Sequence, residues 1–182
     1  MISSMGGRRS MEWTGARYAD GPVVRVQTWV AAPPSRVWEF VSDVERMPDL
    51  SDELQSVRWV APSTCPALGA RFVGSSRHES LGEWSTSSRV VEFDPPRVFA
   101  WEVEGPDADP SATWRFTVEP DGGGTSLRQE VRMGPGRSGL SLAIERMPEK
   151  EQKIVFVRMR EFEANMTRTL AAVKELAEGS DA

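Results

Sequence analysis

Hydrophobic and polar residues alternate with a period of two in seven separate stretches of the chain. The first is PVVRVQTWV at 22–30, where Val24, Val26 and Thr28 share one face. The other stretches lie at 54–60, 70–79, 83–93, 97–103, 112–119 and 125–133, with Gly, Pro, Asp or Ser between them. Such alternation predicts half-buried β-strands. The connections are too short for parallel crossovers, so we expect consecutive strands of the last six to be antiparallel neighbours.

The segment APPSRVWEFVSDVERMPDL at 32–50 has helical spacing but is interrupted. Pro34 suits the first position of a helix, where its missing N–H would have no partner. Asp43 can cap a second short helix, which we expect to end before Pro48. The sequence therefore predicts two short helices after the first strand.

A helical period of three and four residues returns near the C-terminus. The apolar positions with this spacing are Val155, Met159, Phe162, Met166, Leu170, Val173 and Ala177. They predict one long amphipathic helix from about Pro148 to Ala177, with Arg158 among the charged residues placed off its apolar face. We expect the Gly-containing segment 134–147 to be a connection that could serve as a cover.

These elements together predict an α+β fold. A long helix with one apolar face must lay that face on the concave side of the single sheet available. We therefore expect a seven-stranded curved antiparallel sheet wrapped around the C-terminal helix, with the two short helices closing one end of the enclosed volume. The predicted organisation is a loosely ordered lead-in at 1–20, in which Met11 could replace Met1 as the natural start, followed by a single domain at 21–182.

Composition narrows the classes of partner. The chain has 182 residues and a net charge of −5, without the basic stripe that nucleic-acid binding requires. Cys65 is the only cysteine, which fits a reducing compartment, and no stretch approaches the roughly 18 apolar residues of a membrane span. We expect a cytoplasmic protein, either monomer or homodimer. Seven tryptophans against one tyrosine predict an extensive aromatic interior.

The order of elements and several phrases of sequence resemble the START-like (SRPBCC) superfamily of helix-grip proteins. Within it, the polyketide cyclase/dehydrase and lipid-transport family is the most similar. The matching phrases are APPSRVWEFVSDVERMPDLS, LGARFVG, RVVEFDPPRVFAWEV, WRFTVEPDGGGTSL and VRMREFEANMTRTLAAVKELAEG. The resemblance implies a hydrophobic cavity for a lipid-like, polyketide-like or other aromatic molecule. Some members of the family cyclise or dehydrate that molecule, and others bind or carry it.

His78 is the only histidine and the first candidate for catalysis, because histidine titrates near neutral pH. If Phe72 and Gly74 point inward, the period of two places Ser76 and His78 toward the cavity as well. The alternative is that His78 lies exposed beside Glu79 at the end of its strand and has no chemical role.

Trp84, Thr86 and Ser88 share one face of the next strand, where two hydroxyls would meet a ligand carbonyl or water. The alternative is a polar outer face, because Ser85 and Ser87 alternate with them. The other candidates for the wall of the cavity are Met47, Leu50, Trp59, Phe72, Trp101, Trp114, Met159, Phe162 and Met166. Core packing explains many of these residues without any ligand.

The segment 32–50 also suggests an entrance. We expect Met47 and Leu50 to lie over the mouth of the cavity, with the interruptions at Asp43 and Pro48 as the joints of a gate. Arg71, Arg77, Arg89 and Arg115 alternate with the inward positions and should form a solvated outer face.

Three functions remain open at this level. The first is binding of a hydrophobic or aromatic small molecule, with no cofactor and no metal. The second is a polyketide cyclase, aromatase or dehydratase in which the shape of the cavity folds the substrate and His78 or a hydroxyl moves a proton. The third is a module that binds a protein partner through the long helix or its cover.

Overall fold

Seven strands form one antiparallel sheet in a computed structural model of the chain, which describes residues 11–179. The strand order is β1-β7-β6-β5-β4-β3-β2, so β1 and β2 are the edges. The strands are β1 (Val23–Val30), β2 (Leu54–Trp59), β3 (Arg71–His78), β4 (Gly82–Asp94), β5 (Val98–Glu104), β6 (Pro110–Asp121) and β7 (Gly124–Met133). The predicted seven-stranded antiparallel sheet is confirmed.

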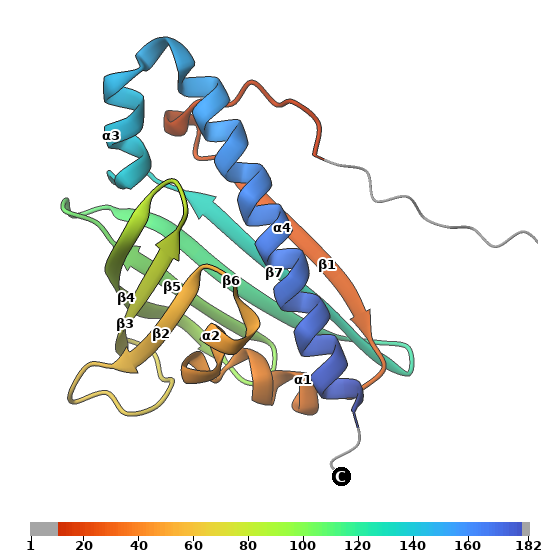
Figure 1. Cartoon of the computed structure of the whole chain (residues 1–182). Coiled ribbons are helices and arrows are strands. Elements are labelled where there is room, and N and C mark those ends of the chain that lie inside the picture. Colours follow the sequence, from red (N-terminus) through yellow and green to blue (C-terminus); the bar gives the residue numbers. More distant parts are fainter. Residues whose placement is uncertain (1–10, 180–182) are drawn as a thin grey trace, which may run out of the picture.

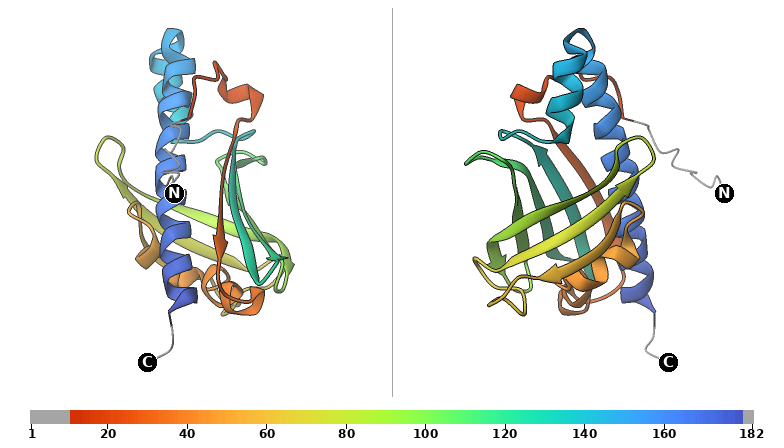
Figure 2. Two further views of the ribbon diagram at one scale, coloured as in Figure 1. Left: turned by 90° about the vertical axis from the view of Figure 1, so that its right-hand side faces the viewer. Right: turned by 60° about the vertical axis from the view of Figure 1, so that its left-hand side comes forward.

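A single long helix lies along the concave side of this sheet, and the sheet curves around it (Figures 1 and 2). The α-helices are α1 (Pro34–Val41), α2 (Met47–Leu50), α3 (Gly139–Arg146) and α4 (Glu151–Glu178). Short 3-10 helices are η1 (Tyr18–Asp20), η2 (Val44–Arg46) and η3 (Pro148–Lys150). Helices α1 and α2 lie near the C-terminal end of α4, and α3 lies at the opposite end (Figure 1). This is the predicted helix-grip fold.

The second short helix differs from the prediction at both of its ends. Pro48 lies inside the first turn of α2 and does not end it, because backbone N–H groups in a first turn have no helical acceptor and proline loses nothing there. Asp43 precedes η2, but its side chain makes no capping hydrogen bond and pairs with Arg46 at 3.5 Å.

The segment predicted as a connection, 134–147, contains the helix α3. Ser138 caps it: the Ser138 hydroxyl accepts a hydrogen bond from the Leu140 N–H at 3.2 Å, and the Ser138 N–H donates to Ser141 Oγ at 3.0 Å. A serine in place of the usual Glu or Gln at the third position makes this signal weak in sequence. The predicted cover is therefore an ordered helix.

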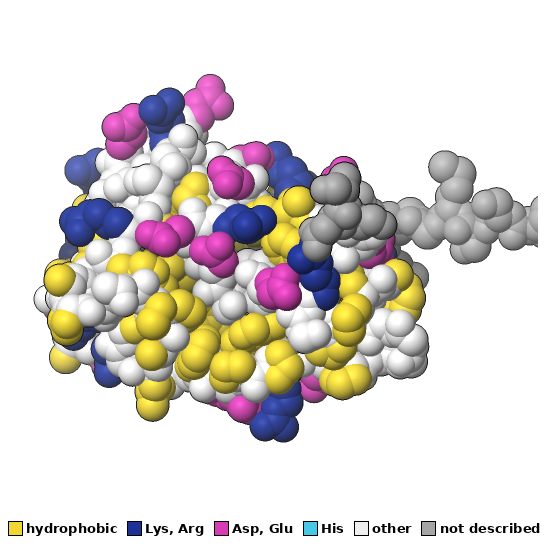
Figure 3. Space-filling view, turned by 90° about the horizontal axis from the view of Figure 1, so that it is seen from below, with side chains coloured by type: hydrophobic (Ala, Val, Ile, Leu, Met, Phe, Trp, Pro, Cys, Tyr) yellow, Lys and Arg dark blue, Asp and Glu magenta, His cyan; other side chains and the backbone are white. Residues whose placement is uncertain are grey.

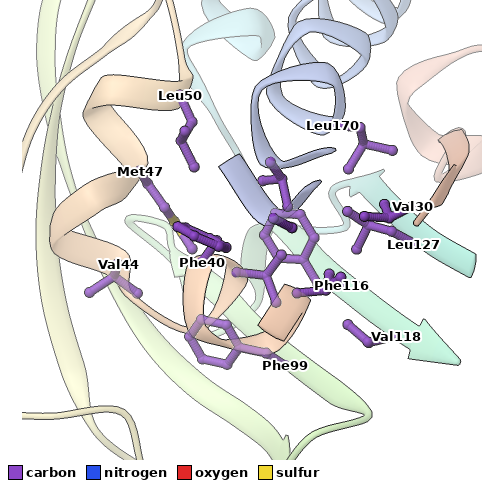
Figure 4. Packing of buried hydrophobic residues seen from close by; sticks show 14 of the residues in the cluster. Val30, Phe40, Val44, Met47, Leu50, Phe99, Phe116, Val118, Leu127 and Leu170 are labelled. Carbon is purple, nitrogen blue, oxygen red and sulfur yellow. The ribbon is translucent and has the colours of Figure 1, made fainter. Parts of the chain in front are cut away.

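The core lies in two clusters on either side of the space between sheet and helix. The larger cluster gathers side chains from α1, α2, β5, β6 and α4, among them Phe40, Met47, Phe99, Phe116 and Leu170 (Figure 4). Phe99 is fully buried, and burial of such a ring contributes roughly 1.5–3 kcal/mol. The smaller cluster joins β1, β7 and the part of α4 from Val155 to Met166.

The outer face of the sheet carries the four arginines that the sequence places there, and each forms an ion pair with a residue of the next strand or of the strand beyond it. The pairs are Arg71–Glu104, Arg77–Glu83, Arg89–Glu102 and Arg115–Glu92. On the underside of the molecule, hydrophobic side chains are spread across a broad area (Figure 3).

Among the described residues, no helix combines the length and the apolar character needed to cross a membrane.

Residues 11–20, which belong to the predicted lead-in, contact the start of α4. The Trp13 ring meets Phe156 edge-on at 5.0 Å, and the Tyr18 N–H donates to Glu151 at 3.1 Å. Arg17 pairs with the same carboxylate. Residues 1–10 and 180–182 lie outside the described part of the chain, and a single domain over 21–182 stays a prediction.

Candidate functional site

A cavity of about 1060 Å³ lies between the concave face of the sheet and α4. Its wall is formed by the inner faces of β3 to β7, the segment from α2 to β2, α3, and the cavity-facing side of α4. Cavities that hold small organic ligands usually measure roughly 300–1,000 Å³. The space is therefore large enough for a molecule of several rings.

Aromatic rings form a continuous surface on one side of this cavity. Trp101 and Trp114 are opposite each other on β5 and β6, with nearly parallel rings 6.4 Å apart. Phe72 meets Trp101 edge-on at 6.0 Å, and Phe162 of α4 meets Trp114 edge-on at 5.3 Å. We call Phe72, Trp101, Trp114 and Phe162 the aromatic wall. It offers both ring faces and ring edges to a flat apolar ligand.

Four predicted polar and aromatic residues of β3 and β4 also line the cavity: Ser76, Trp84, Thr86 and Ser88. Across the two strands, Ser76 is opposite Trp84, and Phe72 is opposite Ser88. Opposite residues share a face of the sheet, so all four lie on the inner face with Phe72. Of the two alternatives left open for the Trp84 face, the structure places it inward. Met47 and Met166 line the cavity as well.

Three other candidates, Leu50, Trp59 and Met159, are not brought to the cavity. Leu50 is buried in the larger core cluster, and Trp59 packs edge-on against Phe72 at 5.7 Å. Met159 is buried in the smaller cluster between α4 and β1. For these three residues, packing in the core accounts for the apolar side chain. This is the alternative to ligand binding that the sequence analysis left open.

His78 lies outside the large cavity, at the end of β3. Its Nε2 is 3.3 Å from a carboxylate oxygen of Glu161 on α4, and its Nδ1 accepts a hydrogen bond from the Ser80 N–H at 3.1 Å. It lines a smaller pocket of about 420 Å³ formed with α3 and α4. The imidazole bridges strand and helix, whereas Ser76 and Thr86 line the large cavity. His78 shares the inward face of β3, but α4 covers it there.

Arg158 was missed as a site residue because its charge suggested the solvated side of the helix. The residue is buried and lines the cavity. Its guanidinium donates to both oxygens of Glu53 at 2.9 and 2.6 Å and to Glu161 at 3.0 Å, and it lies over the Phe162 ring at 4.3 Å. Arg158 comes three residues after Val155 and four before Phe162, a spacing that puts it on the same side of the helix as these two apolar residues. This spacing could have identified Arg158 as an inward residue.

Opposing influences act on the pKa of Arg158. Burial, the largest of them, lowers it, but the hydrogen bonds and negative charges of Glu53 and Glu161 together outweigh burial and raise it above its ordinary value. The guanidinium therefore stays charged, and it is held between two carboxylates.

Gln129 is a second site residue that the sequence analysis did not single out. It lies on β7 between Leu127 and Val131 on the inner face, and all three are buried. Its side chain lines the cavity, and its Oε1 is buried without a hydrogen-bond partner. The alternation of this strand places residue 129 inward, so the period of two could have identified Gln129 as a residue of the inner face.

The cavity opens at the end where α3 lies. Lining residues there are exposed, with Leu142 at 51% and Leu81 at 46%, whereas Met47 at 8% and Phe116 at 2% line the other end. The interpretation of 32–50 as an entrance gate is therefore wrong. Helix α2 closes the base of the cavity, because Met47 and its neighbours on α1 and η2 pack into the larger core cluster.

The described part of the chain contains no cluster of metal-binding side chains. Across residues 11–179, no three His, Cys, Asp or Glu side chains lie close enough together to hold a metal ion. The cavity instead presents aromatic rings, hydroxyls, the amides of Gln129 and Asn165, and the paired guanidinium of Arg158. These groups can bind a ligand by packing and hydrogen bonding.

Comparison with family profiles finds one match. A profile described as polyketide cyclase/dehydrase and lipid transport matches residues 21–178. None of the curated proteins compared with the chain matches it.

Solved structures resemble the fold over most of its length. Cgl2372, a Polyketide_cyc-like protein from Corynebacterium glutamicum, is 25% identical with a TM-score of 0.62, over 86% of this chain and 91% of that one. BexL, a di-domain ARO/CYC protein of the BE-7585A biosynthetic pathway, is 20% identical with a TM-score of 0.61, over 87% of this chain and 50% of BexL. A START superfamily protein from Mycobacterium smegmatis is 16% identical with a TM-score of 0.59, over 84% and 97%. The last two similarities establish the fold alone.

Proposed function

The chain belongs to the polyketide cyclase/dehydrase and lipid transport family, and from that premise we propose that it binds a hydrophobic aromatic small molecule between the sheet and α4. The family and its solved neighbours support the broader statement that such a protein binds hydrophobic ligands or acts in polyketide cyclisation. The finer proposal, an aromatic ligand held inside the cavity, rests on the residues of this chain. We further propose a cytoplasmic location, which the single cysteine fits.

The aromatic wall is the observation that carries the proposal. Trp101 and Trp114 present nearly parallel rings to a cavity of about 1060 Å³, with Phe72 and Phe162 at its sides. Tryptophan faces pack favourably on other aromatic rings, and their burial by a ligand removes further apolar surface from water. A flat ligand of several rings gains from both effects, whereas a thin acyl chain would use little of the parallel ring surface.

A polyketide cyclase or dehydratase is the second candidate. It is favoured by the hydroxyls of Ser76, Thr86 and Ser88, which line the cavity on the same face of the sheet as Trp84. Orientation of a flexible substrate by the shape of a site can supply much of a rate enhancement. His78 takes no part in this proposal, because it lies outside the large cavity and contacts Glu161.

The ligand itself is best sought by native mass spectrometry of the protein purified from its own host. We expect a co-purifying aromatic small molecule, which the measured mass difference would identify by class. A co-purifying saturated fatty acid or phospholipid would contradict the aromatic proposal.

Binding can also be measured with the neutral fluorescent probe N-phenyl-1-naphthylamine. Trp84→Ala removes a ring that lines the cavity and should weaken probe binding at least tenfold, about the loss expected for one buried aromatic contact. Trp13→Ala is the matched control, because Trp13 is exposed and packs on Phe156 outside the cavity. Equal probe affinity in the two folded variants would count against this site.

A further inference from the structure

The smaller pocket, of about 420 Å³, lies outside the large cavity and is not used by the proposed function. It has three walls: α3, residues 150–161 at the start of α4, and the tip of the β3–β4 hairpin, which reaches toward α4 on this side (Figure 2). Its volume is at the lower end of the range for small-molecule sites, roughly 300–1,000 Å³. With walls on three sides it is a groove, which suits a narrow molecule better than a flat surface.

Apolar side chains from all three walls line this pocket. They are Leu81, Leu140, Ala143, Met147, Ile154 and Val157. Three of them remain largely open to solvent: Leu81 is 46% exposed, Met147 37% and Val157 47%. An alkyl chain that covers these side chains removes apolar surface from water on both molecules, which favours binding.

Two lysines lie at one end of the pocket, where α4 begins. Lys150 precedes the helix and Lys153 lies in its first turn, where the helix dipole is already positive. The Lys150 ammonium is 3.8 Å from Met147 Sδ, so its charge lies against the apolar lining. Glu151 of the same turn pairs with Arg17 instead, and neither lysine has a carboxylate partner among the described residues. An anion placed here would meet two cations and the positive end of the helix.

The opposite end of the pocket carries matched charges. Glu161 lies eight residues beyond Lys153, about 12 Å along the helix axis. Its carboxylate pairs with Arg158 at 3.0 Å and lies 3.3 Å from His78 Nε2. Glu149 is next to Lys150 in sequence, but it is exposed and does not line the pocket. The unmatched charge of the lining is therefore positive and lies at one end of an apolar groove.

From the apolar lining and the two lysines, we propose that the smaller pocket binds an amphiphilic anion: a carboxylate on an alkyl chain of medium length. The carboxylate lies between Lys150 and Lys153, and the chain runs along α4 over Ile154 and Val157 toward the hairpin. The site is separate from the large cavity and does not depend on the function proposed for that cavity.

The two sites are neighbours, because Leu81, Leu140 and Ala143 line both. A ligand in the smaller pocket would thus contact α3 and the hairpin, which border the mouth of the large cavity, without entering it. Because the pocket is open to solvent, we expect the ligand to exchange fast and to be lost during purification. A fatty acid that co-purifies would therefore still report on the large cavity.

Methionine methyl NMR distinguishes the two sites. Met147 lines only the smaller of the two pockets, whereas Met47 and Met166 line the large cavity. Titration of protein labelled with ¹³C-methyl methionine should show the Met147 resonance, assigned with Met147→Leu, shifting at lower decanoate concentration than the resonances of Met47 and Met166. Decyltrimethylammonium has the same alkyl chain with a positive head group, and we expect it to bind about tenfold more weakly at the Met147 site.

Two pairs of variants separate charge from apolar contact. Lys153→Gln should weaken decanoate binding about threefold, as expected for one exposed charge. Arg58→Gln is its control, because Arg58 is exposed on β2 and lines neither pocket. Val157→Gln should weaken decanoate binding about fivefold through lost apolar cover. Leu176→Gln is the control for this variant, because Leu176 lies on the same helix, is 40% exposed and lines neither pocket.

Shifts of Met47 and Met166 without a shift of Met147 would overturn the proposal, because decanoate would then occupy the large cavity. Equal binding of decanoate and decyltrimethylammonium would overturn the part that concerns charge. A Met147 resonance that responds to vesicles of anionic phospholipid but not to dissolved decanoate would also overturn the proposal, since the lysines would then mark a membrane contact. None of these results depends on whether an aromatic ligand binds in the large cavity.

Discussion

The two long sides of α4 are joined to the sheet in different ways. On the β1 side, short and medium apolar side chains of Val24, Val131, Val155 and Met159 are buried in one cluster. On the β2 side, long polar side chains make the contacts: Arg158 with Glu53, Glu161 with His78, Asn165 with Ser51, and Arg168 with Asp52.

This difference explains where the cavity lies. Apolar side chains on the β1 side pack directly, so sheet and helix meet there and leave no space. On the β2 side, extended side chains such as Arg158 and Glu53 bridge sheet and helix, and both line the cavity. A helix-grip protein can thus be closed on both sides of its helix and still keep a large interior, provided that one side is joined by long side chains.

The largest expected loss of stability is on the apolar side. Met159→Ala should lower the free energy of unfolding by about 3 kcal/mol, because it leaves a void among buried side chains that cannot fully collapse. Urea unfolding followed by circular dichroism measures the loss. We expect the same value at low and high salt, and a loss that shrinks strongly with salt would contradict an apolar contact.

The polar side should show a smaller loss. Arg158→Met should cost about 2 kcal/mol, less than a fully buried pair, because the side chains of Glu53 and Glu161 keep 19% and 34% of their surface exposed. The double variant Arg158→Met with Glu53→Gln should recover part of this loss, since it removes one of the two unpaired charges. If the double variant is less stable than the single one, charge pairing is not what holds this side.

The smallest effect concerns the last turn of α4, on the β1 side. The Glu178 carboxylate accepts hydrogen bonds from the Ala31 N–H and from Lys174, and these lower the pKa of Glu178. A lowered pKa adds stability above its ordinary value of 4.5, and this stability is lost as the pH falls through the lowered value.

Glu178→Gln should therefore reduce stability slightly at pH 7 and make no difference at the acid end. Melting temperatures of both proteins between about pH 3 and 7 would show this convergence. A gap between the two proteins that stays constant with pH would mean that the charge of Glu178 plays no part.

Most of the fold could be predicted from the sequence, because alternation and helical spacing report which face of each element is buried. The strands from β2 to β7 and the helix α4 follow those patterns directly. Helix α3 could not be found in this way, since it has only eight residues and begins at a weak cap. The predicted end of the second short helix before Pro48 was wrong, because the rule that proline ends a helix does not hold in a first turn.

The site was harder to predict than the fold. Alternation places Trp84, Thr86 and Ser88 inward only if the register of β4 against β3 is known, since polar residues occupy both faces of that strand. Arg158 and Gln129 are polar residues at positions where the spacing of the element places apolar side chains. Whether each has a hydrogen-bond partner depends on residues that are distant in the sequence. His78 follows its strand to the inward face, but the strand runs past the edge of the cavity.

The most direct test of this account is a crystal structure of the protein with bound N-phenyl-1-naphthylamine. We expect its rings to lie inside the cavity against Trp101 and Trp114, between Phe72 and Phe162, with the protein closed around them. A probe bound on the apolar underside of the molecule (Figure 3), with the cavity holding none of it, would contradict the central claim.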